Sequence, residues 1–130
     1  MLLPVEIGTI SVHALRGGSV WVVALIGDHD RSTHKLRAEQ TRRVWPPDAR
    51  IVIDLSGATC IDSSVITWLL RTRRALAATG HPPVRVVAGP PDRLTARVLD
   101  PLSPNLHHTL GCCRTLDEAL DKQPPSRTAP

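Results

Sequence analysis

RIVIDLSGATCIDSSVITWLLRTRRALAATG, the stretch from Arg50 to Gly80, determines how we interpret the rest of the chain. Its opening apolar run, residues 51–55, is too short for a helix and rich in β-branched residues, and therefore predicts a buried strand. Residues 62–64, Asp-Ser-Ser, offer helix caps ahead of apolar residues spaced three and four apart, which predicts a helix over 63–79. The polar centre of this unit lies at the helix N-terminus, where free backbone N–H groups favour an anion.

The same stretch resembles a known signature. IVIDLSGATCIDSS, residues 51–64, is similar to the STAS domain of the anti-sigma factor antagonists, in which an Asp-Ser-Ser-Gly segment carries a phosphorylated serine. LIGDHD, residues 25–30, resembles the Gly-Glu-Leu-Asp loop of that family, and TLDEAL, residues 115–120, resembles its last helix. Most of residues 10–121 can be placed on this pattern.

The resemblance implies a fold and a set of site residues. The expected fold is a single α/β STAS domain over residues 1–122, with a mixed sheet of four to five strands and about four helices mainly on one face. Ser64 corresponds to the phosphoacceptor, with Ser63 as the alternative, and Asp30 and Asp62 correspond to the acidic residues that support it. The expected partner-binding residues are Asp28, Ser63, Val65, Thr67, Trp68 and Arg71.

Three of these residues depart from the family pattern, which has glycine at the positions of Val65 and Thr67 and a small aliphatic residue at that of Trp68. Trp68 lies one turn after Ser64 on the same helix face. It either packs into the core or, if exposed, forms the centre of a partner interface.

The function implied by the resemblance is that of an anti-sigma factor antagonist. Unphosphorylated, it would capture an anti-sigma factor with a kinase-type domain and so free a sigma factor. It would be no enzyme and need no cofactor, and its oligomeric state stays open between monomer and weak homodimer. The alternatives are a STAS regulatory subunit of a membrane lipid or anion transport system, and a degenerate member that binds constitutively.

Composition narrows the class of partner. The 130 residues suffice for one domain, and with no Phe or Tyr and three Trp the core must be aliphatic. An RNA-binding stacking platform is excluded because it needs aromatic residues. The net charge of +4 comes almost wholly from arginine and accompanies no nucleic-acid motif, so an acidic protein is the expected partner.

The chain shows no secretory signal, and its longest apolar run, residues 20–26, is about a third of a membrane span. We therefore expect a cytoplasmic protein without membrane insertion. Three cysteines, two of them adjacent, do not form a disulfide framework, although Cys60, Cys112 and Cys113 are candidates for redox regulation. The histidine pair 107–108 and the cysteine pair 112–113 are poorly spaced to bind a metal ion. The sequence contains no Gly-x-Ser-x-Gly motif, so we do not expect a hydrolase.

The remaining elements follow from local patterns. Residues 9–15 and 19–26 are predicted strands of a hairpin turning at Gly17-Gly18, and residues 27–30 a loop. Further predicted elements are a helix from Asp30 or Ser32 to about Trp45, a strand over 84–89, a helix to about residue 99, a strand over 106–110, a helix over 115–121 and a disordered tail over 123–130.

Overall fold

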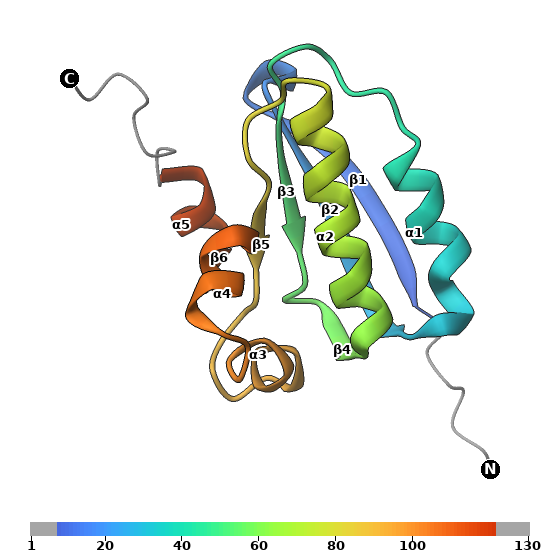
Figure 1. Ribbon diagram of the computed structural model, residues 1–130, viewed down its shortest axis with the longest axis vertical. Helices are drawn as coiled ribbons and strands as arrows, with labels where there is room; N and C mark the ends of the chain where they lie inside the picture. The colour runs from blue at the N-terminus through green and yellow to red at the C-terminus, as the bar shows by residue number, and fades with distance from the viewer. Residues whose placement is uncertain (1–7, 122–130) are drawn as a thin grey trace.

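The computed structural model describes residues 8–121, which form one mixed sheet with helices on both faces (Figure 1). Its six strands are β1 (Thr9–Leu15), β2 (Val20–His29), β3 (Arg50–Asp54), β4 (Ala58–Ile61), β5 (Arg85–Val87) and β6 (Cys112–Cys113). The strand order is β1-β2-β3-β5-β6, with β4 paired to β2, and β1 is antiparallel to β2 while the other pairs are parallel. The predicted α/β fold with a mixed sheet is confirmed, whereas the predicted tail over 123–130 lies outside the described residues.

The described residues contain five α-helices: α1 (His34–Thr41), α2 (Ser63–Ala78), α3 (Leu94–Leu99), α4 (Pro104–Leu110) and α5 (Leu116–Asp121). On one face of the sheet, Val65 and Leu69 of α2 pack with Leu110 of α4 against an aliphatic layer that includes Ile51 and Ile53. Helix α1 lies beside α2 on this face (Figure 1). The layered core is built mainly from aliphatic residues, as the composition requires, and Trp45 and Trp68 are its aromatic members.

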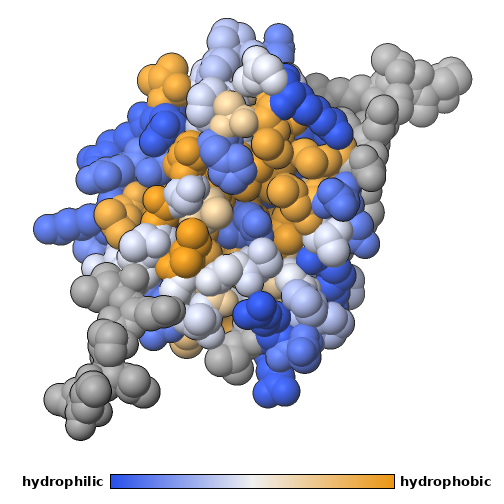
Figure 2. Space-filling model, turned by 180° about the vertical axis from the view of Figure 1, so that it is seen from behind, coloured by the Kyte–Doolittle hydropathy of each residue, from blue (hydrophilic) through white to orange (hydrophobic). Residues whose placement is uncertain are grey.

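The opposite face of the sheet carries a smaller core. Val22 of β2 and Val52 of β3 pack there with Ala119 of α5. Apolar side chains gather over this side of the molecule (Figure 2). Ile26 lies on the same face of β2 as Val22, because side chains alternate along a strand, and it is exposed. Helix α5 therefore covers only a part of the face.

Strand β2 has two parallel neighbours along its length. Its first half pairs with β3, from Val20 opposite Arg50 to Ala24 opposite Asp54, and its last residues pair with β4, where His29 lies opposite Ile61. The strand is longer than predicted, because pairing with β4 keeps residues 27–29 extended. The chain leaves β2 and β4 at neighbouring points, so the segments that lead into α1 and α2 begin side by side.

Helix α1 is shorter than predicted, since it ends at Thr41 and not near Trp45. The two prolines at 46–47 disfavour a helical conformation just before them. Trp45 turns inward and packs beside Trp21 with ring centroids 5.8 Å apart. Trp45 therefore belongs to the connection between α1 and β3, which it anchors to the sheet, and not to α1.

The predicted strand over 106–110 is wrong, because these residues lie in α4. Ser103 caps that helix by accepting a hydrogen bond from the Leu106 backbone N–H at 3.2 Å, and Pro104 occupies its first turn. Gly111 ends the helix with a φ of 59°, in the left-handed region that glycine adopts readily. The strand lies directly after it, at Cys112–Cys113.

Candidate functional site

Ser64 lies in the first turn of α2, at the end of the chain segment that leaves β4. Asp62 is the N-cap: its carboxylate accepts a hydrogen bond from the Ser64 backbone N–H at 2.9 Å and a second from the Ser64 hydroxyl. Ser63 is exposed and Ser64 is half-buried. The sequence therefore places one serine hydroxyl at the positive end of a 16-residue helix, and the cap fixes its direction.

The same Asp-x-Ser turn occurs at three places within residues 8–121. In each, the aspartate accepts hydrogen bonds from both the backbone N–H and the hydroxyl of the serine two residues later. The three pairs are Asp30 with Ser32, Asp54 with Ser56, and Asp62 with Ser64. The turn is therefore a recurrent local structure, and Ser64 must be distinguished by what else it contacts.

That further contact is Arg37 of α1, a residue that the sequence analysis did not single out. Its guanidinium donates to the Ser64 hydroxyl at 3.0 Å, to the Asp30 carbonyl at 3.0 Å and to the Thr33 hydroxyl at 2.6 Å. Only 1% of its surface is exposed, although arginine is rarely buried. Burial lowers the pKa of Arg37 from its ordinary value, while Asp62 and Asp30 oppose that effect. Arginine remains protonated at neutral pH, so a buried cation stands beside Ser64.

A hydrogen-bonded chain continues from Arg37 to the end of β2. The Thr33 hydroxyl lies 3.1 Å from Nδ1 of His29, and Nε2 of His29 lies 2.9 Å from the Thr9 carbonyl and 3.2 Å from the Ile26 carbonyl. Because carbonyls only accept, Nε2 carries the proton and Nδ1 is left as an acceptor, and the one Thr33 hydroxyl proton can go either to Nδ1 or to the Asp30 carbonyl, which lies 3.1 Å away. Burial lowers the pKa of His29, with Arg37 acting in the same direction. The ring is thus held neutral next to the arginine.

Trp68 packs between the two helices. It is 6% exposed, and its indole N–H donates to the Arg37 carbonyl at 2.9 Å and to the Thr41 hydroxyl at 3.0 Å. Of the two roles expected for Trp68, the structure shows the buried one. Its ring nevertheless lines a groove, so that it contributes the wall of a site and not an exposed contact.

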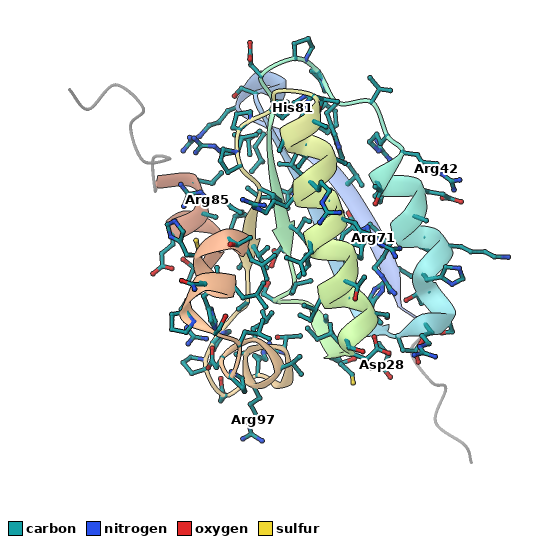
Figure 3. All side chains as sticks on the ribbon, viewed as in Figure 1. Asp28, Arg42, Arg71, His81, Arg85 and Arg97 are labelled. Atoms are coloured by element: carbon teal, nitrogen blue, oxygen red, sulfur yellow. The ribbon has the colours of Figure 1, made fainter. Side chains whose placement is uncertain are left out.

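The groove runs between α1 and α2 beside Ser64 and has a volume of ≈ 470 Å³. Its lining residues are Arg31, His34, Arg37, Ala38, Thr41, Arg42, Ser63, Ser64, Thr67, Trp68 and Arg71. Four arginines and a histidine thus face a space whose lining includes no carboxylate residue. Figure 3 shows Arg71 on the side of α2 that is turned toward α1, and Arg42 near the end of α1. The groove is therefore shaped and charged to receive an anionic group.

The other predicted site residues take varied positions. The Asp30 carboxylate caps the turn before α1, and only the Asp30 backbone reaches Arg37. Asp28 lies in β2 and accepts a hydrogen bond from Thr59 of β4. Val65 is fully buried in the core, so its side chain offers no surface to a partner. Thr67 is exposed on α2, one turn after Ser63, and Arg71 is exposed one turn further along.

The three cysteines are free. Cys60 is exposed on β4, Cys112 is half-buried and Cys113 is buried. Burial raises the pKa of Cys112 to about 11, which keeps its thiol protonated and unreactive at neutral pH. Among residues 8–121, no group of three His, Cys, Asp or Glu side chains is placed to hold a metal ion, and no helix is long and apolar enough to cross a membrane.

No family model and no curated protein matches the sequence, whereas solved structures do resemble this fold. The chain is similar to an anti-sigma factor antagonist from Mycobacterium paratuberculosis, with a TM-score of 0.72 and 27% identity over 92% of this chain and 96% of that one.

Two further structures share the fold. One is an RsbS variant from Moorella thermoacetica, with a TM-score of 0.59 and 20% identity over 86% of this chain and 92% of that one. The other is the anti-sigma factor antagonist SpoIIAA in its unphosphorylated form, with a TM-score of 0.58 and 18% identity over 87% of this chain and 94% of that one. The chain therefore has a fold of the STAS type and is similar in structure to anti-sigma factor antagonists.

Proposed function

We propose that this protein is an anti-sigma factor antagonist whose binding to an anti-sigma factor is controlled by phosphorylation of Ser64. The observation that carries the proposal is the likeness to the mycobacterial antagonist over nearly the whole of both chains. The position of Ser64 supports the proposal for two reasons. Its hydroxyl is only half-buried, so a kinase can reach it, and it lies at a helix N-terminus, which favours the negative charge of a phosphate. The antagonist SpoIIAA, which shares the fold, is described in its unphosphorylated form, and that wording implies that it also has a phosphorylated form.

The phosphoryl donor would be ATP held by an anti-sigma factor with a kinase-type domain. In that step the Ser64 oxygen attacks the γ-phosphorus, the bond to the departing ADP breaks, and the hydroxyl loses its proton. The Asp62 carboxylate already accepts the hydrogen bond from that hydroxyl, so it is placed to take the proton. The antagonist itself would then catalyse nothing and would need no cofactor.

Control of binding would follow from charge. The unmodified site presents Arg31, Arg42 and Arg71 around the groove, which favours an acidic partner surface. A phosphate on Ser64 adds about −1.5 to −2 charges at neutral pH and would cancel much of that attraction. The buried Arg37 would meanwhile offset the repulsion between the phosphate and Asp62, so modification need not unfold the domain. A cytoplasmic location is part of the proposal, since sigma factors act there.

The test is a binding assay with the anti-sigma factor encoded in the source organism, using the wild type, Ser64→Ala, Ser64→Glu and the matched control Ser63→Ala. We expect the wild type and both alanine variants to bind, and Ser64→Glu to bind at least about tenfold more weakly, a difference of about 1.4 kcal/mol. Incubation with ATP should add one phosphate to the wild type and to Ser63→Ala, but none to Ser64→Ala. Equal binding by all four proteins, or phosphate on Ser63, would contradict the assignment of Ser64.

A further inference from the structure

The groove between α1 and α2 has more positive charge than its own structure can balance. Arg31, His34, Arg42 and Arg71 line it together with the buried Arg37, and none of the lining residues is acidic. The ion pair between Arg114 and Asp100 involves none of the residues that line the groove. Exposed arginines on a convex surface are ordinarily just solvated. Here they converge on a concave space beside a helix N-terminus, where an anion is favoured.

Arg37 gives a second and independent indication. It is 1% exposed, it lines the groove, and its Nε has no hydrogen-bond partner among the described residues. A buried donor without a partner costs about 1–3 kcal/mol, so such groups persist mainly where they serve a function. The guanidinium also lacks a carboxylate partner, since Thr33, Asp30 and Ser64 contact it through hydroxyl or carbonyl oxygens. The guanidinium thus touches no anion directly, and the Asp62 carboxylate acts on it only through the Ser64 hydroxyl and at longer range.

We propose that the α1–α2 groove is a phosphate-binding site. Arg37 would supply the buried charge, and Arg42 and Arg71 would close over the phosphate from the two helices. The Ser63 hydroxyl on the same wall can donate to its oxygens, and the Thr67 hydroxyl can do so by turning away from the Ser63 carbonyl, to which it now donates at 3.1 Å. The ≈ 470 Å³ volume is larger than a phosphate alone needs, so the site accommodates a phosphate ester.

Two sources can supply this phosphate. The first is Ser64 itself, whose hydroxyl oxygen lies 3.0 Å from Arg37, and this source rests on the function proposed above. The second is a free phosphate ester in solution, which requires no modification of the protein. Because the chemistry is the same, a phosphate on Ser64 would occupy the site and exclude the second source.

The first experiment titrates the unmodified protein with inorganic phosphate at constant ionic strength, with sodium chloride as the balancing salt. The observable is the indole N–H signal of Trp68 in ¹H–¹⁵N spectra. The indole of Trp21, which donates to the Gly18 carbonyl, serves as the internal reference. We expect the Trp68 signal to move saturably and the Trp21 signal to stay.

Variants show whether the arginines of the groove cause this binding. Arg42→Ala and Arg71→Ala should each weaken phosphate binding about fivefold, as expected for the loss of one exposed charge-assisted contact. The matched control is Arg97→Ala on α3, exposed and far from the groove (Figure 3), and should bind like the wild type. Failure of the Trp68 signal to saturate at tens of millimolar phosphate, or equal weakening by Arg97→Ala, overturns the proposal.

The second experiment separates the two sources, using protein in which phosphoserine is incorporated at position 64. A ³¹P titration should give a second phosphate pKa below the ordinary value of about 6, and Arg71→Ala should raise it. Free phosphate should no longer move the Trp68 signal. If the unmodified protein binds phosphate but Ser64 is never phosphorylated by the anti-sigma factor, the groove stands and the proposed switch fails. If Arg71→Ala leaves the phosphoserine pKa unchanged and the phosphorylated protein still binds free phosphate, Ser64 is rejected as a source of the phosphate in the groove.

Discussion

Replacing the buried arginine beside Ser64 separates its role in binding from any role in stability. In Arg37→Met the side chain keeps a similar length and loses its charge. The protein loses three hydrogen bonds from a charged donor, to Thr33, Asp30 and Ser64, at about 1.5 to 3 kcal/mol each, or roughly 4.5 to 9 kcal/mol.

Two costs of the native arginine disappear at the same time. Keeping a guanidinium out of water costs several kcal/mol, and the unpartnered Nε adds about 1 to 3 kcal/mol. The losses and gains nearly cancel, so we expect the free energy of unfolding of Arg37→Met to lie within about 1.5 kcal/mol of the wild type. For a domain of this size that corresponds to a change of roughly 6 °C or less in Tm.

The assay is urea unfolding followed by tryptophan fluorescence, repeated as a thermal melt. Leu69→Ala, which removes a fully buried side chain of α2, serves as the sensitivity control and should lose about 2 to 5 kcal/mol. Arg37→Met should keep its stability and lose phosphate binding. A loss above about 3 kcal/mol would refute the reasoning, because Arg37 would then be held in place by its contribution to folding.

Three further predictions concern single groups. Asp62→Ala removes the N-cap of α2 and should lower the free energy of unfolding by about 1 kcal/mol, whereas the exposed Asp117→Ala should change it little in the same denaturation assay. Burial lowers the pKa of His29 from 6.5 in the folded protein, so its contribution to stability is fully present above pH 6.5 and is lost as the pH falls toward the folded pKa. The free energy of unfolding of His29→Gln should therefore depend less on pH between pH 7 and about 5 than that of the wild type. Iodoacetamide at neutral pH should modify the exposed Cys60 first and leave Cys112 largely intact, because burial raises the pKa of Cys112 to about 11; peptide mass spectrometry that finds Cys112 modified as fast as Cys60 would contradict this.

The parts of the fold that follow local rules could be predicted from the sequence. Helix α2 begins beside Asp62 and ends near Gly80 as expected, because a cap and an apolar stripe are encoded within a few residues. The hairpin of β1 and β2 also follows from its glycine turn. The failures came where a neighbour in space decides the structure: residues 58–61 form a strand only because β2 extends past β3 to pair with them.

The candidate site was predicted only in part for the same reason. Asp62 and Ser64 are adjacent in sequence, whereas Arg37 reaches Ser64 across 27 positions. From the sequence alone, an arginine on a short polar helix is expected to be exposed to solvent. One signal did exist: α1 has hardly any apolar residue to bury, so a helix that packs at all must bury a polar side chain. That side chain is Arg37.

The double pairing of β2 anchors both helices that form the groove. The chain leaves β2 at His29 and enters α1 at His34 after a short 3-10 turn, and it leaves β4 at Ile61 and enters α2 at Ser63; His29 and Ile61 face each other in one hydrogen-bonded ladder. The two segments that lead into the helices therefore start from neighbouring strands, about 4.8 Å apart, while the helix axes lie further apart because side chains pack between them. A groove of this kind is already formed before anything enters it. Binding then carries little cost of ordering the backbone, and ligands are selected by whether they fit the existing groove.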